Sequence, residues 1–101
     1  MTYNFYDTSS LLLRSNNLFD NPEEKIIISS ITLQELENIK TARNKSEEVK
    51  YKARQLTHLL EANPDKYVCY PYRTTMLERV KDFDINDDLK ILACAIDYDY
   101  N

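Results

Sequence analysis

"KIIISSITLQEL", residues 25–36, contains two different hydrophobic patterns in direct succession. Its three consecutive isoleucines form a short β-branched run, which is typical of a strand covered on both faces. Immediately afterwards, Thr32 and Glu35 have the spacing of a helix-capping box, and the leucines around them fall on one helical stripe. The stretch therefore predicts a buried strand over 25–30, followed at once by a helix that begins at Thr32.

Strands and helices alternate outward from this stretch in both directions. We predict strands over 3–6 and 66–72 and helices over 9–14, 46–62, 74–83 and 87–97. The helix capped by Ser46 has the clearest pattern, because its apolar residues recur at spacings of four, three and four. Residues 91–96 of the last helix are all apolar and are expected to be fully buried. This alternation predicts a three-layer α/β/α fold, in which helices cover both faces of a mainly parallel sheet.

Several residue types are rare or missing, which excludes several classes of function. The sequence has no glycine, so neither a phosphate-binding P-loop nor a dinucleotide-binding glycine loop can form. Its single histidine, His58, cannot build a multi-histidine zinc site and is expected to have a structural or solvent-exposed role. No secretory signal or membrane-spanning run is visible, and the two cysteines show no disulfide spacing, so we expect a cytoplasmic protein without a membrane partner.

The net charge of −4 is unevenly distributed along the chain. Residues 40–81 carry ten basic and five acidic side chains, whereas residues 82–101 carry one basic and six acidic ones. The basic side chains of the middle segment could contact the phosphates of a nucleic acid, although a charged helix face is more often simply solvated. The candidate contacts are Lys40, Arg43, Lys45, Lys50, Lys52 and Arg54.

Four acidic residues stand where an α/β fold places its ligand sites, near the carboxyl ends of the strands. Asp7 follows the first predicted strand, Glu35 lies one helical turn beyond the second, and Asp87 and Asp88 begin the last helix. Carboxylates that converge there would suit Mg²⁺ or Mn²⁺, which prefer oxygen ligands. Each acid also has an ordinary explanation, because all of them lie near predicted helix starts, where acids cap the helix or complement its dipole.

Three segments, "FYDTSSLL", "ISSITLQELENIK" and "NDDLKILACA", resemble the successive acidic motifs of PIN-domain ribonucleases. The resemblance is greatest to the PIN domains that accompany PhoH-type ATPases, which also carry a middle helix like "EVKYKARQLTHLLE". It covers nearly the whole chain and implies one PIN-like domain over residues 1–101. Matched motif to motif, Asp7, Glu35 and Asp88 take the places of the family's catalytic, metal-binding acids, with Asp87 as a possible auxiliary.

The resemblance implies an endoribonuclease that hydrolyses single-stranded RNA and depends on Mg²⁺ or Mn²⁺. Asp7, Glu35 and Asp88 would hold one or two ions. Ser9 or Ser30 could orient these ligands, although both serines more commonly cap helices or end strands. The toxin of a toxin–antitoxin pair would use the same chemistry, and the sequence does not separate the two.

One part of the family pattern is missing from this sequence. The family continues into a strand with a Ser/Thr-x-Asp signature and a fourth acid, and then into a final strand, whereas this chain ends before either. Asp97 cannot substitute, because it lies about 13 Å beyond Asp88 along a helix. We therefore expect an incomplete or reduced PIN-like sheet that lacks the last one or two strands. Such a sheet would also suit a non-catalytic module that binds a protein partner, a C-terminal domain or a second copy through its basic helix or open edge.

Overall fold

The computed structural model describes residues 2–80 and 85–100. Within these residues the elements are β1 (Thr2–Tyr6), α1 (Thr8–Leu13), β2 (Glu24–Ser29), α2 (Ser30–Thr41), α3 (Glu47–Ala62), β3 (Tyr67–Tyr70), the 3₁₀ helix η1 (Thr74–Val80) and α4 (Asp87–Tyr100). Strands and helices therefore alternate, as the α/β prediction requires. The element expected over 74–83 is a 3₁₀ helix rather than an α-helix, and its expected end at 81–83 lies outside the described residues. The last helix continues beyond 97 to Tyr100.

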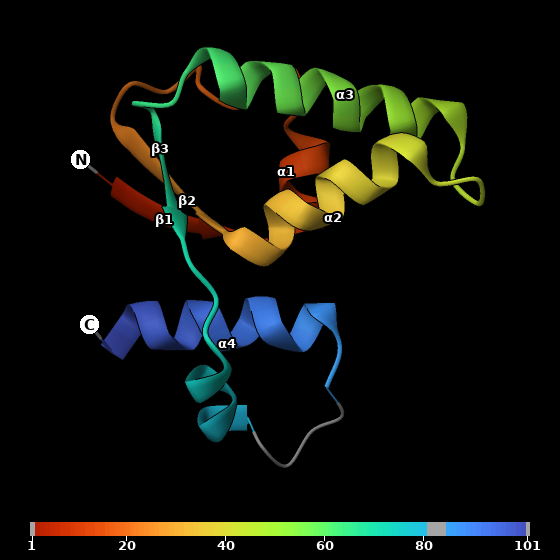
Figure 1. Ribbon diagram of the computed structural model, residues 1–101. Coiled ribbons are helices and arrows are strands. Elements are labelled where there is room, and N and C mark those ends of the chain that lie inside the picture. Colours follow the sequence, from red (N-terminus) through yellow and green to blue (C-terminus); the bar gives the residue numbers. More distant parts are fainter. Residues whose placement is uncertain (1, 81–84, 101) are drawn as a thin grey trace.

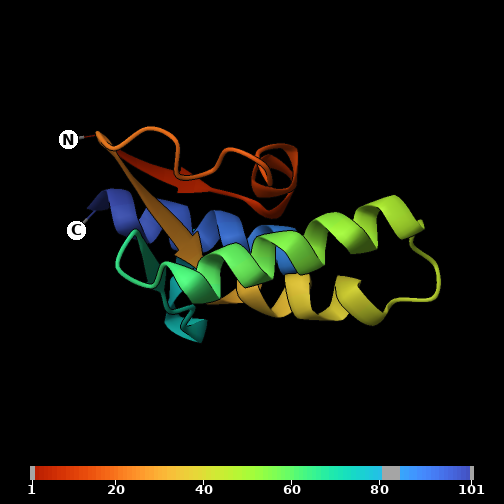
Figure 2. The ribbon, with the colours of Figure 1, turned by 90° about the horizontal axis from the view of Figure 1, so that it is seen from above.

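The strands of the described residues form one parallel sheet in the order β1-β2-β3. Ile27 at the centre of β2 lies opposite Phe5 of β1 and Val68 of β3. Helices α1, α2 and α3 lie on one face of the sheet, and α4 lies on the other together with η1 (Figure 1). Seen from above, α2 and α3 run side by side (Figure 2). This is the predicted three-layer arrangement, with β2 covered on both faces.

Two separate hydrophobic clusters fill the spaces between these layers. On one face, Ile26 and Ile28 of β2 pack against buried residues of α1, α2 and α3, which include Leu11, Leu36, Ala53, Leu56 and Leu60. On the other face, the cluster consists of Met76 and Val80 of η1 with Leu89, Ala93 and Cys94 of α4. Alternate residues of a strand point to opposite faces, so β2 contributes to both sides of the molecule.

Helix α2 begins two residues earlier than the sequence suggested. Its cap is Ser29, whose hydroxyl accepts a hydrogen bond from the Ile31 amide at 3.1 Å. Thr32 is consequently a fully buried residue inside the first turn of the helix. The predicted capping box of Thr32 and Glu35 is therefore wrong, because Thr32 is not the cap. The carboxylate of Glu35 is not used at the start of α2.

Helix α4 buries one stripe of its surface and not its whole circumference. Leu89, Ala93 and Cys94 are buried, but Leu92 is 48% exposed and Ala95 and Ile96 are only partly buried, so the expectation that 91–96 are all fully buried is wrong at these three residues. The helix lies at the outside of the sheet, and only the side that faces the sheet and η1 finds apolar partners. Across the described residues, no helix is both long and apolar enough to cross a membrane.

Candidate functional site

The carboxyl end of β1 leads directly into α1 through Asp7. Asp7 caps this helix, because its Oδ1 accepts a hydrogen bond from the Ser10 amide at 2.8 Å. The cap uses one oxygen of the carboxylate, and the residue as a whole remains exposed at this end of the sheet. Capping therefore fixes the position of Asp7 and leaves the carboxylate accessible to a ligand.

The amino-terminal end of α4 gives its two aspartates different surroundings. The helix is capped by Asn86, whose Oδ1 accepts a hydrogen bond from the Leu89 amide at 2.8 Å. The Oδ1 of Asp87 lies 4.0 Å from the Nζ of Lys90, one turn further along the helix. Asp88 is exposed, and its side chain has no hydrogen bond or ion pair with any described residue. Because Asn86 already serves as the cap, the side chain of Asp88 is available for another role.

Asp7 and Asp88 line the same pocket, a cavity of about 380 Å³. Ser9 adds a hydroxyl to its polar side, while Phe5 and Leu92 belong to its apolar side. Proteins usually bind Mg²⁺ through one or two carboxylates together with water and phosphate oxygens, so this donor set fits such an ion. The structure thus brings together the first and the last of the predicted acids, which come from opposite ends of the sequence.

Glu35 lies beside this pocket and does not line it. Thr8, the residue after Asp7, donates a hydrogen bond from its Oγ1 to the Oε1 of Glu35 at 2.7 Å. Glu35 lines a second cavity, of about 220 Å³, together with Asp87 and Lys45. Within residues 2–80 and 85–100, no three His, Cys, Asp or Glu side chains are grouped closely enough to hold a metal ion. The four acids therefore fall into two pairs, which the Thr8–Glu35 hydrogen bond links.

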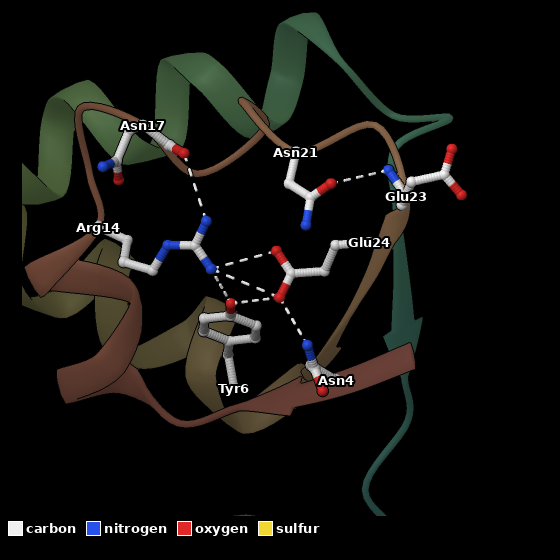
Figure 3. Close-up of polar contacts among 7 residues, drawn as sticks. All are labelled: Asn4, Tyr6, Arg14, Asn17, Asn21, Glu23 and Glu24. Atoms are coloured by element: carbon white, nitrogen blue, oxygen red, sulfur yellow. Dashed lines mark hydrogen bonds and ion pairs between the residues drawn. The ribbon is translucent and has the colours of Figure 1, made fainter. Parts of the chain in front are cut away.

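A polar network anchors β1 to the start of β2 and to α1 (Figure 3). Glu24 is at its centre. Its side chain is only 7% exposed, and it accepts hydrogen bonds from the Tyr6 hydroxyl and from the side-chain Nδ2 of Asn4, each at 2.6 Å. The NH1 of Arg14 lies 3.1 Å from the Oε1 of Glu24 and also donates to the Tyr6 hydroxyl. Because Tyr6 directly precedes Asp7, this network fixes the end of the strand from which Asp7 extends.

The same contacts set the charges of Glu24 and Tyr6. Burial alone would raise the pKa of Glu24, but the hydrogen bonds from Tyr6, Asn4 and Arg14, together with the positive charge of Arg14, outweigh burial and hold this pKa below its usual value. Burial and the hydrogen bond to Glu24 raise the pKa of the Tyr6 hydroxyl. At neutral pH the network therefore pairs an ionised Glu24 with a neutral Tyr6, which is an arrangement that stabilises structure.

A model of the PIN-domain family matches residues 5–101 of the chain. The matched range includes all four acids and every helix of the described residues. The chain belongs to the PIN-domain family. PIN domains are typically nucleases and generally depend on divalent metal ions, which agrees with the pair of carboxylates in the first pocket. Neither the curated proteins nor the solved structures contain a significant match to this PIN domain.

The six basic residues predicted to contact RNA do not form one uncompensated surface of this PIN domain. Three of them lie near a glutamate on their own helix: Lys40 with Glu37 at 3.2 Å, Lys50 with Glu47 at 3.5 Å and Lys52 with Glu48 at 3.5 Å. The other three, Arg43, Lys45 and Arg54, are exposed and have no ion pair among the described residues. Among these three, Lys45 lines a cavity together with the predicted acids Glu35 and Asp87.

Thr8 is the residue that sequence reasoning missed. It follows Asp7 directly, but its contact with Glu35, 27 positions away, depends on how α1 packs against α2. Of the two serines considered as supports, Ser9 lines the pocket of Asp7. Ser30 instead accepts a hydrogen bond from the Tyr72 amide at 2.9 Å and ties the segment after β3 to α2.

Asp97 and His58 agree with what the sequence led us to expect. Asp97, in the last turns of α4, accepts a hydrogen bond from the Tyr70 hydroxyl at 2.5 Å. It does not line the pocket that contains Asp88. His58 is an exposed residue of α3.

Proposed function

We propose that this PIN domain is an endoribonuclease that hydrolyses single-stranded RNA and depends on Mg²⁺ or Mn²⁺. The observation that carries the proposal is the pocket shared by Asp7 and Asp88, which joins the end of β1 to the start of α4. Carboxylate oxygens are the ligands that these ions prefer. Membership of a family of typical nucleases supports the same function.

In this proposal the acids have distinct roles. Asp7 and Asp88 would hold the ion, and Asp87 would assist from the same turn of α4. The ion would supply the Lewis acidity that lowers the pKa of a bound water and neutralises charge on the scissile phosphate. Thr8 holds the carboxylate of Glu35 beside Asp7, where it orients the water or a further ligand. Hydrolysis joins the water oxygen to phosphorus and releases the ribose oxygen, which takes up a proton.

Binding of Mn²⁺ to the 101-residue chain, measured by calorimetry, tests the metal site directly. We expect Asp88→Asn to weaken binding at least tenfold, which is about 1.4 kcal/mol. Asp99→Asn is the matched control, because it removes an exposed carboxylate of the same helix that does not line the pocket. If Asp88→Asn and the wild-type chain bind Mn²⁺ equally, Asp88 is not a ligand and the proposed site is wrong. A ribonuclease assay on the same variants then separates metal binding from catalysis.

Lys45 is the basic residue best placed to bind the RNA backbone, because it shares a cavity with Glu35 and Asp87. Each phosphate contact releases bound counterions, so the loss of one contact lowers the slope of log affinity against log salt by about 1. We expect this change in Lys45→Ala when a single-stranded oligonucleotide is titrated. Lys52→Ala is the control, since Glu48 already compensates the charge of Lys52. Equal effects of the two substitutions would remove Lys45 from the RNA site.

A non-catalytic binding module is the second candidate, and one observation favours it. No three metal-binding side chains are grouped within the described part of the chain. The module's partner would be another protein, and the resemblance to PIN domains that accompany PhoH-type ATPases makes an ATPase domain the first one to test. A wild-type chain that neither binds Mn²⁺ nor cleaves RNA would favour this second function.

A further inference from the structure

Another cavity, of about 220 Å³, lies where β2 and β3 begin. Its walls are the connection from α1 to β2 and the connection from α3 to β3, and we call it the Phe19 cavity after the aromatic residue in its lining. Because the strands of the described residues are parallel, this cavity and the pocket of Asp7 and Asp88 lie at opposite ends of the sheet. The Phe19 cavity shares no lining residue with either cavity of the candidate site. The proposed metal chemistry therefore does not explain it.

Hydrogen bonds hold both walls of the Phe19 cavity in place. The Nζ of Lys25 donates to the backbone carbonyl of Asp65 at 2.7 Å, which ties the two walls together. In the first wall, the Oδ1 of Asn21 accepts a hydrogen bond from the Glu23 amide at 3.0 Å (Figure 3). The amide of Glu24 donates to the Asn21 carbonyl at 3.2 Å. The cavity is therefore largely preformed, as sites for small ligands usually are.

The lining of the Phe19 cavity combines an aromatic ring with two cationic side chains. The Nζ of Lys66 lies 6.0 Å from the centre of the Phe19 ring. Neither Lys25 nor Lys66 forms an ion pair with any residue that the structure describes. The Nδ2 of Asn21 likewise has no acceptor in the described part of the chain. The cavity therefore presents hydrogen-bond donors and positive charge beside the apolar surface of Phe19 and Pro22.

Two acids also line the Phe19 cavity, and they compensate its lysines only in part. The Oε1 of Glu24 already lies 3.1 Å from the NH1 of Arg14, at the buried centre of the network described above. Asp65 is exposed and has no ion pair with a described residue. Two lysines therefore face a single carboxylate that is not already paired. This imbalance favours a ligand with a negative charge.

We propose that the Phe19 cavity binds one nucleotide, with the base against Phe19 and the phosphate at Lys25 and Lys66. Its size suits a single base, because an apolar cavity of about 150 Å³ is enough to hold benzene. Proteins that bind single-stranded nucleic acids combine the same groups, since cationic side chains follow the phosphates and aromatic side chains stack on the bases. A simple anion would leave the apolar surface of Phe19 and Pro22 in water, and an apolar ligand would leave the lysines without a partner. The nucleotide is either free or part of a single-stranded RNA, and its binding does not require the acids of the candidate site to be catalytic.

Amide chemical shifts measured by NMR locate the binding of adenosine 5′-monophosphate (AMP) on the 12.0 kDa chain. The titration is carried out in EDTA, which removes divalent ions, so its result does not depend on whether the acids bind a metal. We expect shifts in residues 19–25 and 65–66 and no comparable shifts at Asp7 and Asp88. If AMP shifts none of the amides of the Phe19 cavity, or shifts those of Asp7 and Asp88 instead, the proposal is wrong. Failure of the proposed nuclease function would leave this result unchanged.

Matched variants test the two parts of the ligand separately. Lys66→Gln should weaken the binding of AMP about fivefold, because it removes one exposed charge from the phosphate. Lys52→Gln is the control, since Lys52 does not line the cavity. Phe19→Leu keeps an apolar side chain against the core but removes the ring, so it should weaken the binding of AMP and leave that of inorganic phosphate unchanged. Equal affinities of Lys66→Gln and Lys52→Gln for AMP, or inorganic phosphate that binds the wild-type chain as tightly as AMP, would overturn the proposal.

A short single-stranded oligoadenylate separates the two sources of the nucleotide. If the strand shifts the amides of the Phe19 cavity at a lower concentration of nucleotides than AMP requires, the cavity holds part of an RNA. If AMP binds at least as tightly as the strand, the cavity holds a free nucleotide. A strand and an AMP that both leave these amides unshifted would refute the site for either source.

Discussion

Glu24→Gln should destabilise the fold, although it replaces only one non-hydrogen atom of the side chain. The carboxylate of Glu24 is almost fully buried and receives hydrogen bonds from Tyr6, Asn4 and Arg14. Hydrogen bonds to a charged group contribute about 1.5–3 kcal/mol each, and an amide keeps part of each interaction. Arg14 is one-third exposed, so water screens its charge in part. We therefore expect a loss of about 2 kcal/mol, which is a decrease of roughly 10 °C in Tm.

The stability difference between wild type and Glu24→Gln should depend on pH. The pKa of Glu24 in the folded protein lies below its usual value, so the folded state favours the ionised carboxyl. This contribution is complete above the unfolded pKa of about 4.3 and is lost as the pH falls through the folded pKa. The difference should therefore be largest at neutral pH and shrink in acid.

Urea unfolding of both proteins at several pH values measures this difference. Glu23→Gln is the matched control, because Glu23 precedes Glu24 but is exposed and lies outside the hydrogen bonds to Glu24 (Figure 3). We expect the control to change stability by less than about 0.5 kcal/mol. A difference for Glu24→Gln that stays constant from neutral pH to below the folded pKa would show that ionisation of Glu24 does not stabilise the fold.

Two further predictions concern the core and the thiols. Leu56→Ala, at a fully buried position of α3, should lower the free energy of unfolding by about 3–5 kcal/mol in denaturant titration, whereas Leu13→Ala, at an 84% exposed position, should change it by less than about 0.5 kcal/mol. A thiol reagent should modify the exposed Cys69 in the native protein and reach the buried Cys94 only after unfolding. Two equally fast thiols would contradict the packing of Cys94 against Ser29 and Met76.

The sequence predicted best those elements that are encoded locally. Ser46 was identified as a helix cap, and in the structure its hydroxyl accepts a hydrogen bond from the Val49 amide at the start of α3. The start of α2 was predicted wrongly because "SSIT" offers several good caps in succession, and the packing of β2 decides that Ser29 is used. Leu92 shows the same limit, since composition does not reveal which side of α4 faces the sheet.

The candidate site could be predicted only in part. The rule that parallel strands present ligand residues at their carboxyl ends is enough to expect Asp7 at the edge of the sheet. The structure adds that Asp88 shares its pocket, while Glu35 is held by Thr8 at its side. That division depends on the distance between helices packed on opposite faces of the sheet, which no local pattern encodes. Whether these acids bind a metal ion stays a prediction.

The two carboxylates of the shared pocket, Asp7 and Asp88, stand on helices that pack in different hydrophobic clusters. Asp7 caps α1, which packs in the cluster of α2 and α3, whereas Asp88 belongs to α4, which packs in the cluster with η1. Local opening of α4 would separate the two acids while the rest of the fold persists. Amide hydrogens of α4 should then exchange faster than those of β2, and an ion bound by both acids should slow that exchange. Binding of the metal ion and packing of α4 against the sheet would therefore be coupled, so that each favours the other.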